Sequence, residues 1–135
     1  MREVLVDTNY WIAIVNPRDN LYRRARQVGS ALRDAKLLTT DAILTEYLNH
    51  FAGYDPRLRD AAAAQTRDVL EGNGAESVVT GREWLLRGLD LYERRRDKQY
   101  SLVDCISMEI MRERDIAEVL THDHHFAQEG FTILL

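Results

Sequence analysis

Short apolar runs alternate with longer amphipathic segments along the whole of this 135-residue chain. The apolar runs have the length and composition of buried strands, and they lie at residues 4–6, 37–39, 77–79, 117–120 and 131–134. Helical spacing of apolar side chains marks the segments between them, at residues 10–15, 21–36, 43–51, 55–70, 81–95, 101–114 and 124–128. This alternation predicts an α/β fold with a central parallel sheet of four to five strands, covered by helices on both faces.

Composition narrows the class of protein. The length fits one domain over residues 1–135, and 45% hydrophobic with 30% charged residues is ordinary for a globular protein. Neither a long apolar run nor a signal-peptide pattern is present, and the single cysteine, Cys105, suits a reducing compartment. We therefore expect a cytoplasmic protein. The net charge of −4 argues against a protein that coats nucleic acid by bulk electrostatics.

Four acidic residues fall where a parallel sheet would bring them together. Asp7 directly follows the first strand, and Asp123 follows the fourth. Glu46 lies one to two turns into the helix after the second strand, and Asp104 lies in the first turn of the helix that Ser101 opens. In such folds ligands bind beyond the carboxyl ends of the strands. The four side chains are expected to converge at that edge.

A divalent cation would account for such a cluster. Carboxylates placed close together disfavour joint ionisation, and a cation removes that repulsion. Mg²⁺ and Mn²⁺ prefer oxygen ligands, and they can activate water and neutralise charge on a phosphodiester. The cluster therefore predicts phosphodiester hydrolysis. His122, His124 and His125 surround Asp123, but the sequence offers them no evident partner set for zinc.

Each acid also has a structural explanation that needs no metal. Asp7 could cap the helix that begins near Thr8, and Asp123 could serve in a turn. Asp104 forms a capping-box pattern with Ser101, and Glu46 could be a solvated helix residue. The run at residues 94–98, Arg-Arg-Arg-Asp-Lys, could guide phosphates but is also typical of a basic helix end. Spacing alone leaves these alternatives open.

Four sequence pieces, taken in order, resemble the PIN-domain nucleases and, within them, the VapC-like toxins of type II toxin–antitoxin systems. The pieces are Val-Leu-Val-Asp-Thr-Asn at residues 4–9, Thr-Glu at 45–46, Tyr-Ser-Leu-Val-Asp-Cys at 100–105, and Leu-Thr-His-Asp-His-His-Phe at 120–126. The late Ser-x-x-Asp and Thr-x-Asp-x-x-Phe motifs are the more specific ones. The resemblance covers essentially the whole chain.

This resemblance implies a Rossmann-like α/β/α domain that cuts RNA with Mg²⁺ or Mn²⁺. Asp7, Glu46, Asp104 and Asp123 match the acidic quartet of the family, as catalytic residues and metal ligands. Thr8, Asn9, Ser101 and Thr121 match the polar residues that support it. The family further implies products with 5′-phosphate and 3′-hydroxyl ends, a homodimer, and an inhibiting antitoxin protein.

Other functions remain possible at this stage. A PIN-like RNA-binding or scaffold module with little or no nuclease activity is the main alternative, although all four acids are present. A haloacid-dehalogenase-type phosphoryl-transfer enzyme also begins with a strand followed by Asp, but it needs a second acid two residues later. Asn9 occupies that position here, which disfavours this class.

Overall fold

A five-stranded, fully parallel sheet forms the centre of the protein, and the computed structural model describes all of residues 1–135. The strand order is β3-β2-β1-β4-β5. The strands are β1 (Glu3–Val6), β2 (Lys36–Thr40), β3 (Glu76–Val78), β4 (Glu118–Leu120) and β5 (Thr132–Ile133). The first strand therefore lies in the middle, between β2 and β4, and the chain order reverses there. Such a switch point is where ligands bind in open α/β sheets.

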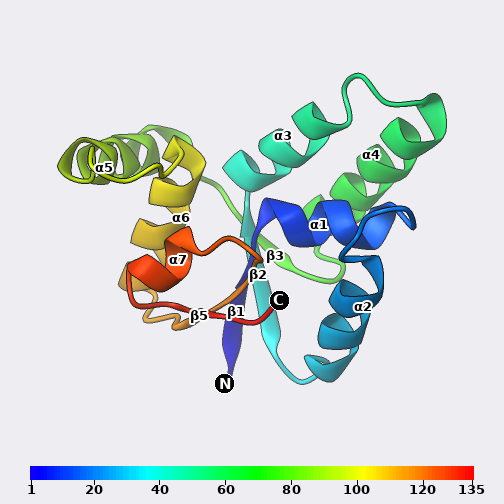
Figure 1. Cartoon of the computed structure of the whole chain (residues 1–135), viewed down its shortest axis with the longest axis horizontal. Helices are drawn as coiled ribbons and strands as arrows, with labels where there is room; N and C mark the ends of the chain where they lie inside the picture. The colour runs from blue at the N-terminus through cyan, green and yellow to red at the C-terminus, as the bar shows by residue number, and fades with distance from the viewer.

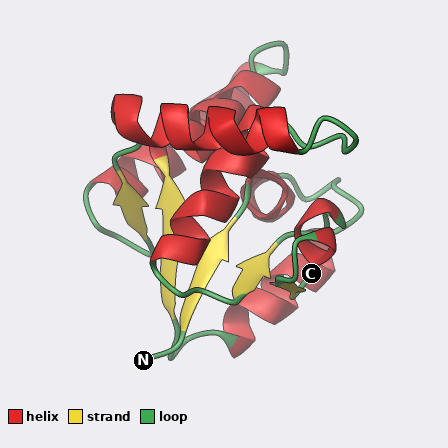
Figure 2. Ribbon diagram, turned by 90° about the vertical axis from the view of Figure 1, so that its left-hand side faces the viewer, coloured by secondary structure: helices red, strands yellow, loops and turns green.

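Seven helices surround the sheet: α1 (Thr8–Val15), α2 (Tyr22–Ala31), α3 (Asp41–His50), α4 (Pro56–Leu70), α5 (Gly81–Arg94), α6 (Leu102–Glu113) and α7 (His125–Gln128). In Figure 1, α1 and α2 lie on one side of the sheet, and α6 and α7 lie on the other. Helices α3 and α4 pack with α1, while α5 packs along α6. Figure 2 shows the strand arrows running in one direction, away from the N-terminus, so their carboxyl ends share one edge.

Every strand and helix expected from the sequence is present, and the α/β/α prediction is confirmed. The largest difference in bounds concerns the second helix, which was expected to reach residue 36 but ends at Ala31. Lys36 instead begins β2, because its backbone N–H bonds to the carbonyl of Arg2 and its Cα pairs with that of Glu3. Strand pairing therefore overrides the helical pattern there. No helix is long and apolar enough to cross a membrane.

The hydrophobic core is one continuous cluster of 25 buried residues that includes the apolar residues of β1 and, from α6, Cys105, Met108 and Met111. Helix α6 is buried because α5 covers its outer side. The close approach of these two helices depends on Gly88. A Cβ at this position would lie 2.5 Å from Ile106 Cγ1 and 3.0 Å from the backbone nitrogen of Ile106. The backbone atom cannot rotate away, so α6 would have to shift.

We expect Gly88→Ala to destabilise the protein by about 1–3 kcal/mol, the usual range for overpacking a core. Denaturant unfolding followed by circular dichroism measures this. Gly53→Ala is the matched control, because a Cβ at Gly53 meets nothing within 4 Å. Equal stability of the two variants would contradict the close packing of α5 on α6.

Candidate active site and metal centre

The register between β1 and β4 brings the first acidic residue into place. Val6 pairs with Leu120, so the residues that follow, Asp7 and Thr121, leave the sheet side by side. The backbone N–H of Asp7 still bonds to the carbonyl of Leu120, at 3.1 Å. Both side chains are buried at the carboxyl edge of the sheet.

The Thr121 hydroxyl links the two segments that follow β1 and β4. It donates its one hydrogen to Asp7 Oδ2, at 2.8 Å. It accepts hydrogen bonds from Asn9 Nδ2 and from the backbone N–H of Asp123, each at 3.0 Å. Asn9 Oδ1 in turn accepts the backbone N–H of His122, at 3.2 Å. Because one hydroxyl has one donor and two acceptor positions, Thr121 is fully used in holding Asp7 and Asp123 in place.

Glu46 reaches the same site from α3. That helix begins directly after β2, and the hydroxyl of Thr40 caps it by accepting the backbone N–H of Ile43. Glu46 then lies in the second turn, half-buried, and accepts a hydrogen bond from the hydroxyl of Thr8. Glu46 is therefore not a freely solvated helix residue, which was the explanation of its position that needs no metal.

Asp104 is held by the start of α6. The predicted capping box is present: Ser101 Oγ accepts the backbone N–H of Asp104 at 3.0 Å, and Asp104 Oδ2 accepts that of Ser101 at 3.2 Å. The box and a metal role do not exclude one another, because the box uses one lone pair of Oδ2 and an ionised carboxylate has about four. Asp104 is also buried, unlike most capping residues.

Asp123 and His125 complete the cluster. Asp123 Oδ1 accepts the backbone N–H of His125 at 2.9 Å, which is the predicted turn role. The same turn brings the His125 ring back over the acids, with Nδ1 3.1 Å from Asp104 Oδ2 and 3.2 Å from Asp123 Oδ1. One cleft is lined by all four acids, His125 and Gln99.

Burial and mutual repulsion raise the pKa of three of the acids in this cleft. Burial, together with the charges of Asp104 and Glu46, raises the pKa of Asp7 to about 7. Burial and the charge of Asp123 also raise the pKa of Asp104, although the hydrogen bond with His125 works in the opposite direction. For Glu46, burial is the largest cause of a raised pKa, and the Thr8 hydroxyl partly offsets it. The cluster therefore binds protons or cations more readily than isolated acids would.

The side chains fit a divalent cation. Asp7 Oδ1 is buried and has no hydrogen-bond partner, and leaving a buried oxygen unpaired is unfavourable unless a ligand meets it. Asp7 makes no capping hydrogen bond to α1, so the capping explanation does not account for its burial. Ligand atoms of Asp104, Asp123 and His125 lie within 4.8 Å of one another. This set of carboxylate oxygens with one imidazole is suited to Mg²⁺ or Mn²⁺.

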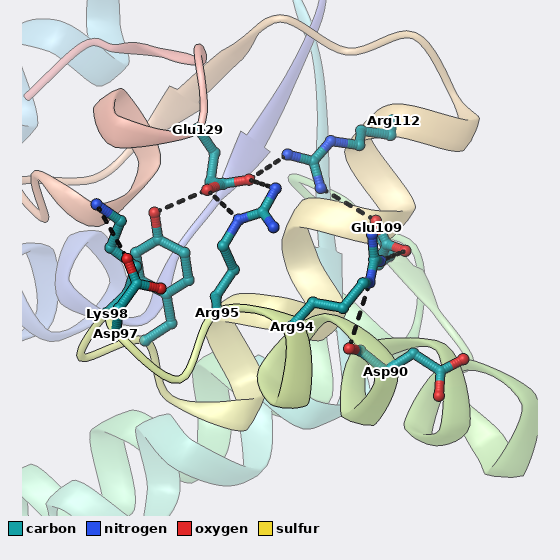
Figure 3. Close-up of polar contacts among 9 residues, drawn as sticks. Asp90, Arg94, Arg95, Asp97, Lys98, Glu109, Arg112 and Glu129 are labelled. Atoms are coloured by element: carbon teal, nitrogen blue, oxygen red, sulfur yellow. Dashed lines mark hydrogen bonds and ion pairs between the residues drawn. The ribbon is translucent and has the colours of Figure 1, made fainter.

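An ion-pair network behind the cleft fixes the loop that leads into α6. Glu129 follows α7, and its side chain is only 6% exposed. It accepts hydrogen bonds from Arg95 at 3.0 Å, from Arg112 at 2.6 Å and from the hydroxyl of Tyr100 at 2.9 Å. Figure 3 shows both guanidinium groups converging on the Glu129 carboxylate. The Tyr100 ring also packs on His125, with centroids 5.2 Å apart.

Part of the basic run at residues 94–98 has a structural role. Arg94 pairs with Glu109 and Arg95 pairs with Glu129, so these two arginines are engaged within the chain. Asp97, the acid within this run, is exposed and lies near Lys98 rather than in the cleft.

Comparison with known proteins places the chain in a family. The sequence model of the PIN domain matches residues 4–131. The chain belongs to the PIN-domain family. The predicted membership and fold are thus confirmed, and all four acids lie within the matched residues.

Relatives of this PIN domain cover nearly its whole length. It is 26% identical over 132 residues to VapC20 of two Mycobacterium tuberculosis strains, named a 23S rRNA-specific endonuclease, and the match covers 95% of both proteins. The crystal structure of M. tuberculosis VapC20, described as a sarcin–ricin loop cleaving toxin, superposes with a TM-score of 0.85 at 20% identity and 96% coverage of both chains. FitAcB from Neisseria gonorrhoeae superposes with a TM-score of 0.69 at 14% identity, over 98% of this chain and 96% of that one.

The structure brings the four predicted acids together, and it adds His125 and Gln99 to the same cleft. All eight predicted site residues lie at this edge of the sheet: Asp7, Thr8, Asn9, Glu46, Ser101, Asp104, Thr121 and Asp123. His125 was set aside because no partners were evident for it, yet the turn at Asp123 supplies them. A signal was available, since an Asx-turn two residues long predicts that His125 folds back toward Asp123.

Glu129→Gln should destabilise the PIN domain at pH 7 by roughly 1–3 kcal/mol, since two arginines lose a charged acceptor. Burial alone would raise the pKa of Glu129, but Arg95, Arg112 and Tyr100 outweigh it and lower the pKa to about 2, from an ordinary 4.5. A lowered pKa stabilises the folded state above pH 4.5, and this stabilisation is lost as the pH falls towards 2. The difference between wild type and variant should shrink over that window in denaturant unfolding.

Glu113→Gln is the control for this measurement. It breaks an exposed ion pair with Arg87, and such pairs contribute about 0–1 kcal/mol. A Glu129→Gln variant no less stable than Glu113→Gln would contradict the structural role of the network.

Proposed function

We propose that this PIN domain is a metal-dependent endoribonuclease in which Asp7, Glu46, Asp104 and Asp123 form the active site. The observation that carries the proposal is the convergence of these four acids in one cleft around a buried Asp7 oxygen that has no partner in the chain. A purely structural cluster would pair its buried oxygens or avoid the charge. The nuclease activity named for VapC20 supports the same reaction.

Asp7, Asp104 and Asp123 would hold a divalent cation, Mg²⁺ or Mn²⁺, with Glu46 beside them. When bound, the cation supplies charge neutralisation at the phosphodiester and activation of water. Thr121 and Asn9 hold Asp7 and Asp123 in position, Ser101 does so for Asp104, and Thr8 for Glu46. Because these bonds exist before any ligand arrives, little reorganisation is needed on binding.

The remaining chemistry belongs to the chain's own groups. Glu46 is half-buried with a raised pKa, which suits it to accept a proton from the attacking water. The new bond forms between the water oxygen and phosphorus, the bond from phosphorus to the ribose 3′-oxygen breaks, and the leaving 3′-oxygen takes up a proton from solvent. The products are a 5′-phosphate end and a 3′-hydroxyl end. Gln99 also lines the cleft, where its amide can hydrogen-bond to the RNA strand.

Ribosomal RNA is the substrate class that we favour. VapC20 is named for 23S rRNA, and its crystal structure is described by cleavage of the sarcin–ricin loop. Because this chain is 26% identical to VapC20 over 95% of both chains, a structured rRNA hairpin is the first substrate to test. A ribosomal RNA substrate also supports the cytoplasmic location, which is part of this proposal.

We further propose that the protein is the toxin of a toxin–antitoxin pair, a single PIN domain over residues 1–135 that works as a homodimer. The description of VapC20 as a toxin supports an antitoxin partner. Exposed apolar residues on α5 support contact with another protein or a second copy: Leu85, Leu86, Leu89 and Tyr92. A surface patch of this kind is typical of an interaction site.

Cleavage of total 23S rRNA and of a sarcin–ricin loop hairpin tests the proposed function. The wild type should cut in the presence of Mg²⁺ or Mn²⁺ and not in EDTA. Asp7→Asn and Asp104→Asn should each reduce the rate by at least about 100-fold, because each removes a charge from the metal centre. Product ends should be 5′-phosphate and 3′-hydroxyl.

Asp97→Asn is the matched control, since it removes an exposed acid close to α6 but outside the cleft, and it should cut like the wild type. Folded protein free of bound inhibitor that cuts neither RNA would favour the alternative of a PIN-like RNA-binding module. Cutting that persists in EDTA, or 2′,3′-cyclic phosphate ends, would contradict the metal-dependent mechanism.

A further inference from the structure

His125 is the one imidazole that lines the cleft, and its ring nitrogen lies beside two carboxylates. Its Nδ1 lies 3.1 Å from Asp104 Oδ2 and 3.2 Å from Asp123 Oδ1. Two ligands in adjacent octahedral positions, about 2.1 Å from one ion, lie roughly 3.0 Å apart. Both distances from His125 Nδ1 to a carboxylate oxygen therefore match the spacing of neighbouring ligands.

Two contacts fix the ring in this orientation. The backbone N–H of His125 bonds to Asp123 Oδ1, and the ring packs on Tyr100, whose hydroxyl bonds to Glu129. Glu129 is itself held by Arg95 and Arg112. A ring that is oriented in advance loses little entropy when it binds an ion.

The buried oxygen of Asp7 supplies an independent sign that a cation belongs here. Asp7 Oδ1 has no partner in the chain, and Asp7 lines the same cleft as His125. The neighbouring His122 and His124 are exposed and pack near each other, 6.1 Å between ring centroids, and neither lines the cleft. Of these three histidines, only His125 is in position to act as a ligand.

We propose that the His125 imidazole is a nitrogen ligand of the cation in this PIN domain, and that it makes the site selective for Mn²⁺ over Mg²⁺. This inference rests on the proposed metal-dependent function. Imidazole binds first-row transition ions well, whereas Mg²⁺ prefers carboxylate and water oxygens. An all-carboxylate cleft would give no such discrimination on ligand type.

Metal binding to the full chain tests this without any measurement of activity. Calorimetry on chelator-treated protein should show Mn²⁺ binding roughly tenfold tighter than Mg²⁺. His125→Ala should weaken Mn²⁺ by about tenfold or more and Mg²⁺ much less, while the control His124→Ala should change neither. Pulsed electron paramagnetic resonance of Mn²⁺ bound to the wild type should show coupling to ¹⁴N, which His125→Ala abolishes.

The outcomes separate the two proposals. Mn²⁺ bound without ¹⁴N coupling, or equal weakening of both ions by His125→Ala, would overturn the role of His125 and leave the nuclease intact. It would mean that His125 only donates a hydrogen bond to the carboxylates. Wild-type protein that binds neither ion would overturn the metal-dependent function itself. The ¹⁴N measurement on the wild type needs no variant to fold.

Discussion

The repulsion among buried carboxylates at the carboxyl ends of β1 and β4 is the constraint on which the site depends. Parallel pairing of Val6 with Leu120 makes the two strands end together, so Asp7 emerges beside Thr121 and close to the loop of Asp123. Helices α3 and α6 then add Glu46 and Asp104 from either side. Bringing these charges together is unfavourable in the absence of a cation, which is why burial and neighbouring charges raise the pKa of Asp7, Glu46 and Asp104.

The surrounding structure holds this unfavourable arrangement in place. Thr121 uses all its hydrogen-bonding capacity on the site, and the capping box at Ser101 fixes Asp104 at the start of α6. Farther out, Glu129 ties Arg95, Arg112 and Tyr100 together, so the loop before Ser101 and the turn that carries His125 are braced against each other (Figure 3). Each acid is thus positioned by hydrogen bonds that do not use up all its oxygens. This leaves lone pairs for an ion and explains how one residue can serve as both cap and ligand.

Apolar periodicity predicted the fold, whereas the four acids were proposed from their places at strand ends and helix starts and from the resemblance to PIN domains. Strand and helix existence follows from apolar spacing, and the position of Asp7 after a buried strand places it at the ligand-binding edge. What the sequence could not supply were contacts that depend on tertiary geometry. Lys36 joined β2 because Arg2 and Glu3 were available to pair with it. The His125 ring contacts Asp104, which lies 21 positions away in the sequence. Arg94 and Arg95 form ion pairs with Glu109 and Glu129 rather than facing solvent or phosphate.

An NMR titration of the Asp7 side-chain carboxyl carbon, with and without Mg²⁺, tests the central claim most directly. Mg²⁺ is used because it is diamagnetic, whereas Mn²⁺ would broaden the signal. Asp7→Asn provides the assignment. In metal-free protein the account predicts a midpoint near the pKa of about 7 that burial and the neighbouring carboxylates impose. With saturating Mg²⁺ that midpoint should fall below the ordinary value of 3.8, because the cation replaces the proton. An Asp7 that titrates in the ordinary acid range without metal, or whose midpoint Mg²⁺ does not move, would contradict the view that this cleft is built around a cation.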